Sequence, residues 1–254
     1  MKDLIGKVAI VTGASSGIGH EAARLFASEG ARLVVSGRHR AALDALVGDI
    51  GDSGGEAVAL AGDVREEDVA RRLVEMAVDR FGGLDIAFNN AGITGETAPL
   101  PDLSLHNWRD ILDSNLTSGF LGAKYQLPAM VARGGGSLIF TSSFVGHSAG
   151  FPGMAAYAAA KAGLIGMVQV IAAEFGARNI RANALLPGGT DTPMGRAATP
   201  TPESRAFIES LHALKRMAQP LEIARAALFL ASDAASFVTG TAMLVDGGVS
   251  INRT

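Results

Sequence analysis

Short runs of apolar and β-branched residues alternate along this chain with longer segments in which apolar residues recur every three or four positions. The short runs predict buried strands, and the longer segments predict helices that bury one face. Seven strands are expected, at about residues 7–12, 31–36, 56–61, 84–88, 137–141, 180–185 and 241–245. Helices are expected between them, at about residues 22–29, 41–50, 66–81, 105–130, 155–175, 203–213 and 221–232.

This alternation predicts an α/β fold with a doubly wound parallel sheet and helices on both faces. No linker, repeat or low-complexity segment divides residues 1–254, so a single domain is expected. The stretch at about residues 191–217 departs from the alternation. Within it, residues 195–202 are rich in Ala, Thr and Pro and are expected to be irregular. Long irregular insertions are often substrate lids.

The expected helix at 155–175 is apolar on every side. Leu164 and Val168 belong to one face, and Gly166 and Val170 belong to the other. A helix that is apolar all round is buried all round, which in an open α/β sheet implies a covering subunit. The sequence therefore predicts a homotetramer or homodimer. The same stretch makes a poor membrane span, because it carries the polar side chains of Tyr157 and Lys161.

Composition narrows the class of protein further. Hydrophobic residues make up 48% of the chain and charged residues 19%, which is typical of an ordered globular domain. The net charge of −3 gives no electrostatic footprint for nucleic acid. With no cysteine there is neither a disulfide frame nor a thiolate metal site, and no metal is expected. The first residues lack a signal-peptide core, so a soluble cytoplasmic protein is predicted.

A glycine-rich turn follows the first strand. Residues 13–19 read Gly-Ala-Ser-Ser-Gly-Ile-Gly and lead into the first helix. Glycines let a backbone approach a pyrophosphate, and a helix N-terminus offers free N–H groups and a positive dipole end. The spacing matches the G-x-G-x-x-G fingerprint only loosely, but the flanking strand and helix indicate a phosphate-binding turn.

The second strand ends in Ser36-Gly37-Arg38. A site that prefers NAD usually has an acidic side chain here to accept from the ribose 2′-hydroxyl. Gly37 offers none, and the Arg38 guanidinium suits a 2′-phosphate. The sequence thus predicts NADP(H) as the preferred cofactor, with NAD(H) possible. Arg40 either assists or is a solvated charge at the start of a helix.

Polar residues also follow the third and fourth strands. Asp63 either orients an adenine or caps the next helix. The turn Asn89-Asn90-Ala91-Gly92 suits asparagines that bond the backbone, a structural role beside the cofactor. Asn115 lies inside a predicted helix, either as a buried polar side chain whose hydrogen bonds are all made or as a functional group.

Tyr157 and Lys161 are four residues apart and therefore share one helix face. An ammonium beside a phenol favours the phenolate, so the pKa of Tyr157 is expected to fall from its usual value of about 10 toward neutrality. Such a tyrosine can exchange a proton with an alcohol oxygen at working pH. Ser143 precedes a loop containing Gly and Pro and could place its hydroxyl on the same oxygen.

Together these motifs resemble the short-chain dehydrogenase/reductase family in its single-domain form, and most closely its 3-oxoacyl-(acyl-carrier-protein) reductase-like subgroup. The resemblance covers nearly the whole chain. It rests on the glycine turn, the turn at 89–92, Asn115, Ser143, Tyr157, Lys161, Pro187-Gly188, Thr192 and the C-terminal pattern from Phe229 to Gly248.

The resemblance implies a Rossmann-type NAD(P)-binding domain and hydride transfer between a nicotinamide and a carbonyl or secondary alcohol. In the implied tetrad, Tyr157 exchanges the proton with the substrate. Lys161 lowers the pKa of Tyr157 and holds the nicotinamide ribose. Ser143 forms a hydrogen bond with the substrate oxygen, and Asn115 holds a water molecule or a backbone group. The implied cofactor-binding residues are Gly13, Ser15, Ser16, Gly17, Ile18, Gly19, Arg38, Asp63, Val64, Asn89, Ala91, Gly92, Tyr157, Lys161, Pro187, Gly188, Thr190 and Thr192.

Two departures from the family pattern leave alternatives open. The loop between Ser143 and Tyr157 is one residue longer than usual, so Ser142 is an alternative catalytic serine. Thr190 stands where the family usually has an aliphatic residue.

The substrate, a small carbonyl compound or alcohol, is not specified by the sequence. A sugar or polyol dehydrogenase working oxidatively is an alternative, and a non-catalytic nucleotide-binding regulator is another. The pocket is expected to be shaped by loops near 93–100, 147–154 and 193–213. Within them, Glu96 and His147 either line the pocket or lie on the surface.

Overall fold

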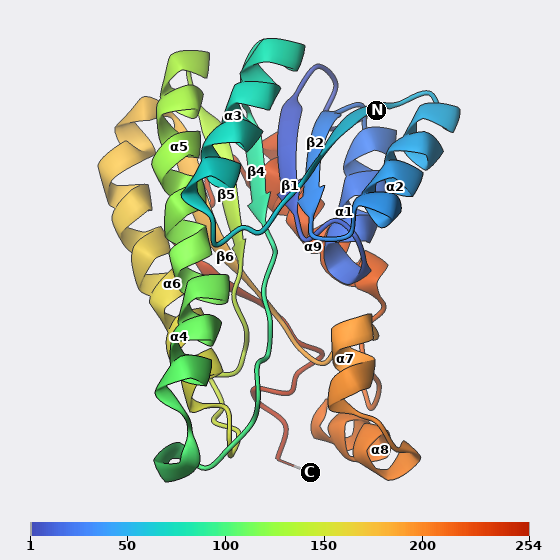
Figure 1. Ribbon diagram of the computed structural model, residues 1–254, viewed down its shortest axis with the longest axis vertical. Helices are drawn as coiled ribbons and strands as arrows, with labels where there is room; N and C mark the ends of the chain where they lie inside the picture. The colour runs from blue at the N-terminus through green and yellow to red at the C-terminus, as the bar shows by residue number, and fades with distance from the viewer. Residues whose placement is uncertain (1, 254) are drawn as a thin grey trace.

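The computed structural model describes residues 2–253 and confirms the predicted α/β fold. Seven parallel strands form one sheet in the order β3-β2-β1-β4-β5-β6-β7 (Figure 1). The strands are β1 Val8–Thr12, β2 Arg32–Gly37, β3 Glu56–Ala61, β4 Ile86–Asn89, β5 Gly136–Thr141, β6 Ile180–Pro187 and β7 Ala242–Val245. The strand order reverses between β1 and β4, and ligands of open α/β sheets bind at the carboxyl ends of strands beside such a switch point.

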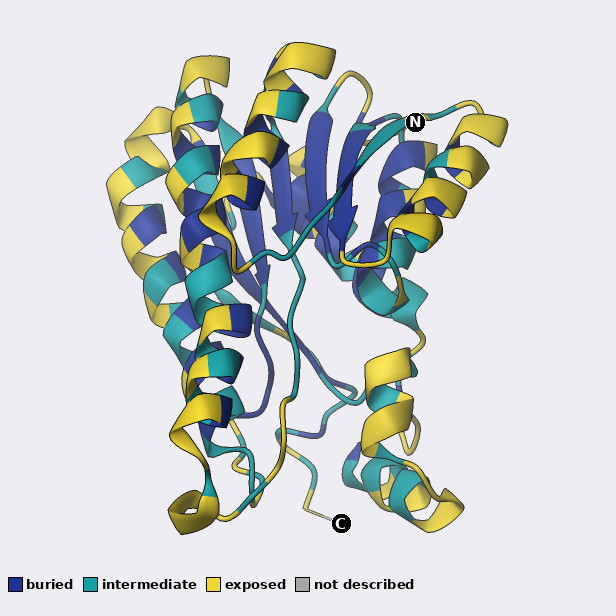
Figure 2. Cartoon of the chain, viewed as in Figure 1, coloured by how far each residue is buried: buried dark blue, intermediate teal, exposed yellow. Residues whose placement is uncertain are grey.

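Helices cover both faces of the sheet, as predicted. The helices are α1 Gly17–Ser28, α2 Arg40–Asp52, α3 Glu67–Phe81, α4 Leu105–Leu112, α5 Ser118–Arg133, α6 Ala155–Phe175, α7 Pro193–Ala198, α8 Pro202–Leu211 and α9 Pro220–Ala231. One face packs against α1, α2 and α9, and the other against α3, α5 and α6. Alternate residues of a strand therefore enter opposite cores, as Val8 and Ala9 do, so the central strands are largely buried, while the edge strands β3 and β7 are partly exposed (Figure 2).

Two local features differ from the sequence prediction. The helix expected at 105–130 is interrupted by a π-helical turn at Asp113–Thr117, which contains Asn115. The stretch expected to be irregular contains α7, which begins where the Thr192 hydroxyl accepts a hydrogen bond from the Gly195 N–H at 3.0 Å. Pro193 occupies the first turn of that helix, where its missing N–H costs nothing.

Within residues 2–253, one helical stretch, Ala155–Arg178, is long and apolar enough to cross a membrane by length and composition alone. That test is also passed by core helices of soluble proteins. Leu164, Val168 and Ile171 of this stretch are buried against the sheet, as in such a helix.

Candidate active site

A cavity of about 610 Å³ lies at the carboxyl ends of the strands. Its size is within the range of roughly 300–1,000 Å³ that is usual for small-molecule and cofactor sites. Every predicted site residue lines this cavity except Gly19 and Asn89. The structure thus brings together the glycine turn, the ends of β2 to β6, and residues of α7 and α8.

Close packing explains the glycine turn. The Thr12 hydroxyl accepts hydrogen bonds from the backbone N–H groups of Asn90 and Ala91, at 3.0 and 3.1 Å. A Cβ on Gly13 would lie 2.9 Å from the Asn90 side chain, and a Cβ on Gly19 would lie 2.4 Å from the Gly13 carbonyl oxygen. Gly19 therefore allows the close packing of the turn and does not face the cavity.

The start of α1 fits a phosphate. Its N-cap, Ser16, makes no side-chain capping bond within the part of the chain that the structure describes. Residues 15–18 line the cavity, so N–H groups at the positive end of the helix face it. The donors that this turn offers suit a dinucleotide pyrophosphate.

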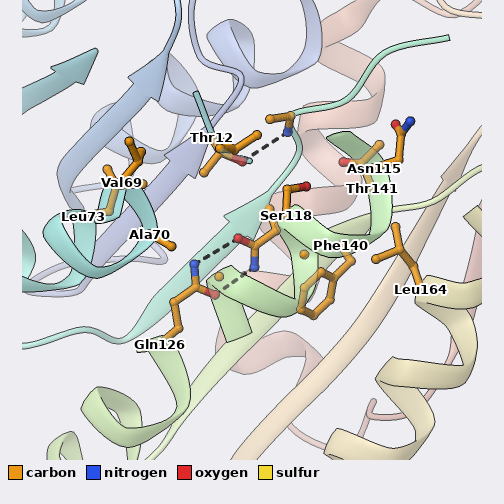
Figure 3. A pocket seen from close by; sticks show the side chains of 15 residues that line it. Thr12, Val69, Ala70, Leu73, Asn115, Ser118, Gln126, Phe140, Thr141 and Leu164 are labelled. Carbon is orange, nitrogen blue, oxygen red and sulfur yellow. Dashed lines mark hydrogen bonds between the residues drawn. The ribbon is translucent and has the colours of Figure 1, made fainter. Parts of the chain in front are cut away.

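Asn89 points away from the large cavity, toward α5. Its side-chain amide and that of Gln126 form two reciprocal hydrogen bonds, of 2.8 and 2.9 Å (Figure 3). A Cβ on Gly122 would lie 2.8 Å from the Asn89 side-chain oxygen, so a glycine is needed there. The amide pair borders a second cavity of about 20 Å³, room for one water molecule, which Asn115 and Thr141 also line. Asn89 thus pairs with a side chain of α5 behind the large cavity, whereas the sequence predicted a bond to the backbone and the family resemblance implied a contact with the cofactor.

The two adjacent serines make different contacts. The Ser142 hydroxyl is buried and donates to the Lys161 carbonyl at 2.7 Å. The Ser143 hydroxyl accepts from the Val145 N–H at 3.1 Å and is hydrogen-bonded to the Tyr157 phenol. Of the two, Ser143 is therefore the serine placed beside the phenol.

Lys161 is buried, with 3% of its surface exposed, and its ammonium donates to the Thr141 carbonyl at 2.7 Å. The Nζ atom lies 5.6 Å from the centre of the Tyr157 ring. Burial lowers the pKa of Lys161 to about 7.

The pKa of Tyr157 is not lowered in this state, in contrast to the sequence expectation. Burial raises it, and the hydrogen bond with Ser143 offsets that rise only in part. The physical reason is that the Lys161 ammonium is itself destabilised by burial and faces the Thr141 carbonyl. Tyr157 is therefore a protonated phenol at neutral pH.

Asn115 is a buried polar side chain whose amide group is fully hydrogen-bonded. Its amide group donates to the Ile93 and Ile111 carbonyls at 2.9 and 2.8 Å, and its oxygen accepts from the Ile93 N–H at 3.2 Å. A Cβ on Gly92 would lie 2.4 Å from that oxygen and 3.3 Å from the Lys161 Nζ atom. Asn115 thus fixes the segment after β4 against the π-helical turn, next to Lys161.

At the end of β2, Gly37 is buried beneath Ser15, and a Cβ there would lie 3.0 Å from the serine hydroxyl. The neighbouring Arg38 is exposed and lines the cavity, and within residues 2–253 no ion pair holds its guanidinium. Arg40 does not line the cavity and pairs with Asp44 at 2.8 Å, as expected of a solvated charge at a helix start.

Asp63 caps no helix, because the N-cap of α3 is Glu66. Its carboxylate accepts from the Arg65 guanidinium at 2.6 Å, and this contact lowers the pKa of Asp63. Both side chains line the cavity, so Arg65 is a second cation at this end of the site that the sequence analysis missed.

The other end of the cavity is closed by the segment after β6. The Thr190 hydroxyl donates to the Gly188 carbonyl at 3.0 Å, which gives this unusual threonine a local structural role. A Cβ on Gly17 would lie 3.0 Å from the Thr192 methyl group, so the start of α7 packs against the glycine turn.

His212 is a cavity-lining residue that the sequence analysis did not identify. It is buried at the end of α8, where its Nε2 accepts from the Gly189 N–H at 3.0 Å and its Nδ1 donates to the Ile208 carbonyl at 2.8 Å. No local pattern distinguishes this histidine in the sequence beyond its position in the expected lid. Glu96 and His147 are exposed and do not line the cavity, which agrees with their interpretation as surface residues.

Comparisons with known proteins agree with this arrangement. The family model described as enoyl-(acyl carrier protein) reductase matches residues 13–250. A 2,5-dichloro-2,5-cyclohexadiene-1,4-diol dehydrogenase from Sphingobium indicum is 42% identical over 98% of both chains. A 3-oxoacyl-(acyl-carrier-protein) reductase from Thermotoga maritima is 38% identical over 98% of this chain and 99% of its own. The structure of a candidate NAD(P)-dependent gluconate 5-dehydrogenase from Beutenbergia cavernae with bound NADP superposes with a TM-score of 0.92, at 34% identity over 98% of this chain and 99% of that one.

Proposed function

The chain belongs to the short-chain dehydrogenase/reductase family, and we propose that Tyr157 is the general acid and base of its reaction. It is an NAD(P)-dependent oxidoreductase that interconverts secondary alcohols and carbonyl compounds. The nicotinamide supplies the hydride chemistry when bound, and the protein supplies geometry and proton transfer. The observation that carries the proposal is the hydrogen bond between Ser143 and Tyr157 beside the buried Lys161.

In the direction of reduction, the protonated phenol of Tyr157 donates its proton to the substrate oxygen. Ser143 orients the phenol and bonds the same oxygen as negative charge develops on it. Lys161, with a pKa of about 7, carries a partial charge near neutral pH and stabilises the phenolate left behind. Asn115 positions the backbone beside Lys161. In oxidation, the phenolate removes the alcohol proton.

Replacement of Tyr157 by Phe tests this assignment, since it keeps the ring and removes the acid. We expect turnover to fall by about 10²- to 10⁴-fold, with little change in cofactor affinity measured by calorimetry. Ser143→Ala should also impair turnover strongly, and Ser142→Ala should do so less. Near-normal turnover in Tyr157→Phe, or the reverse ranking of the serines, would contradict the assignment.

NADP(H) is proposed as the preferred cofactor. The support is an exposed Arg38 at the cavity, with no acidic side chain at Gly37 to repel a 2′-phosphate. A hydrogen bond to a charged group contributes roughly 1.5–3 kcal/mol, so one contact favours NADP(H) by about 10- to 100-fold. We expect Arg38→Ala to remove most of this preference in kcat/KM and Arg40→Ala to leave it unchanged. Equal use of both cofactors by the wild type would refute the proposal.

The remaining proposals concern the setting of the enzyme. A cytoplasmic homotetramer is proposed, or a homodimer, acting on a small molecule without nucleic acid or membrane. Residues 191–217 are proposed to be the substrate lid, since α7 and α8 line the cavity. The gluconate dehydrogenase neighbour favours a sugar-type substrate oxidised by the enzyme as the alternative function. All four residues of the implied catalytic tetrad are present, which favours an enzyme over a non-catalytic nucleotide-binding regulator.

A further inference from the structure

The cavity is lined beside Tyr157 by apolar side chains from three separate segments. One segment joins β5 to α6, the second is the end of α8, and the third follows β7. These side chains pack with the Tyr157 ring into one cluster, and we refer to them as the apolar wall. They are Phe144, Val145, Phe151, Met154, Leu211 and Val249. Because the wall surrounds the phenol from several directions, the body of a substrate at Tyr157 contacts it.

Charged side chains lie elsewhere in the cavity. Among its described lining residues, the acidic and strongly basic ones are Arg38, Asp63, Arg65 and Lys161. The first three follow β2 and β3, on the opposite side of β1 from the strand that leads to the wall. The Lys161 ammonium donates to the Thr141 carbonyl, and its proposed role is to stabilise the Tyr157 phenolate.

Two histidines also line the cavity, and neither has been placed to contact a substrate at the wall. His39 adjoins Arg38 at the end of β2. His212 lies near the wall, but Gly189 and Ile208 occupy both of its ring nitrogens. Apart from Lys161, whose Nζ atom donates to the Thr141 carbonyl, no lysine or arginine among the described residues that line the cavity lies beside the wall to pair with an anionic substrate.

Resting on the proposed function, we infer that the site takes neutral ketones and secondary alcohols with a compact apolar body, and discriminates against the same body carrying a carboxylate. Burial of apolar substrate surface against the wall is favourable. An ionised carboxylate in the same place would lose its hydration without gaining a partner, which is costly. The substrates favoured are thus neutral alcohols and ketones with an apolar body, and sugar acids are disfavoured.

The test uses three ketones that differ in charge at constant ring size: cyclohexanone, 4-oxocyclohexanecarboxylate and the methyl ester of that acid. Their kcat/KM values are measured with saturating NADPH. We expect the ester to exceed the carboxylate by at least about tenfold, with cyclohexanone also above the carboxylate. Because the ester is larger than the acid and cyclohexanone is smaller, a ranking that places both above the carboxylate reflects charge and not size. A preference for the carboxylate would overturn the inference.

A gained cation tests the location of the wall. Leu211→Arg places a guanidinium in the wall at the end of α8, and Phe207→Arg places the same charge on an exposed position of that helix, away from the cavity. We expect Leu211→Arg to reduce the ratio of ester to carboxylate by about tenfold or more, and Phe207→Arg to leave it unchanged. An unchanged ratio in Leu211→Arg, or equal changes in both variants, would overturn the placement.

A binding measurement separates failure of this inference from failure of the proposed function. In the presence of NADP⁺, each ketone should raise the melting temperature in the same order as its kcat/KM, because a ligand that binds the folded state stabilises it. If the ketones bind in that order without turnover, or if Tyr157→Phe retains full turnover, the proposed function fails and the inference stands. If the carboxylate stabilises the protein most, the inference fails and the proposed function is unaffected.

Discussion

Lys161, for which a catalytic role is proposed, is buried at an energetic cost. Its pKa is about 7 in the folded protein and near 10.5 in the unfolded chain. Between these pH values the unfolded chain binds a proton at this residue and the folded protein does not. The free energy of unfolding therefore rises with pH across that window, and the destabilisation is largest below pH 7.

Lys161→Met should remove this pH dependence in the cofactor-free protein. We expect the unfolding free energy of the wild type, relative to the variant, to increase by about 1–2 kcal/mol between pH 7 and pH 9. The loss of the donor to the Thr141 carbonyl shifts the whole curve without changing its slope. Urea denaturation at several pH values measures the difference, with Lys2→Met on the surface as control. Parallel curves for Lys161→Met and the wild type would contradict the expected pKa.

At the scale of single residues, the sequence predicted which side chains lie close together better than it predicted their pKa values and hydrogen bonds. Tyr157 and Lys161 could be paired because helical spacing is fixed. The direction of the Tyr157 pKa could not be predicted, because it depends on burial by segments distant in sequence. The difference between Ser142 and Ser143 likewise depends on the Lys161 carbonyl, which the chain reaches only after a loop.

Among the elements, the proposed lid is joined to the rest of the site partly through the His212 side chain. Its ring joins α8 to the segment after β6 through hydrogen bonds with Ile208 and Gly189. A Cβ on Gly189 would lie 2.9 Å from the ring, so the contact is close. Leu211 of the apolar wall is the neighbour of this histidine in the sequence.

His212→Leu should loosen the lid, because it leaves the Gly189 N–H and the Ile208 carbonyl unpaired at a cost of about 1–3 kcal/mol. We expect faster hydrogen exchange over residues 202–211 and a KM for the ketone raised roughly tenfold, with kcat reduced less. His106→Leu, at an exposed position on α4, is the matched control. Unchanged exchange in the lid of His212→Leu would show that the histidine does not hold it.

Most elements could be predicted because strand and helix periodicities are local. The π-helical turn at Asp113–Thr117 could not, because it exists to let Asn115 reach the backbone of Ile93, a contact set by the tertiary structure. The helix α7 was predictable in principle, since Thr192 and Pro193 form a start signal. Its length of six residues was too short to show a period.

For the whole molecule, the exposed apolar side chains of the described residues include two surfaces suited to association. On the outer side of α6, Val170 is 55% exposed, and nothing lies within 4 Å of a Cβ built on Gly166. Phe120, on α5 over the same face of the sheet, is 52% exposed. The sequence predicted an all-round apolar helix here, and the structure places only one side of it against the sheet.

The second surface lies at the edge of the sheet formed by β7. Leu244 on that strand is 40% exposed, and Phe237, in the segment between α9 and β7, is fully exposed. The β7 strand has one neighbour, β6, among the described residues, so its other edge is open. An open strand edge with apolar side chains is a site for association.

These two surfaces lie on different parts of the molecule, which predicts a tetramer built from two kinds of interface. Each interface should bury on the order of 2,000 Å² if it is obligate. Light scattering at micromolar concentration is expected to give four times the chain mass of 26.0 kDa. Val170→Arg and Phe237→Arg should each halve that mass, because each charge disrupts one interface and leaves the other. Phe207→Arg, on the lid and outside both surfaces, should leave the mass unchanged. A wild-type mass of 26.0 kDa would refute the assembly. If the wild type is a dimer and only one of the two variants disrupts it, the protein has only that one interface.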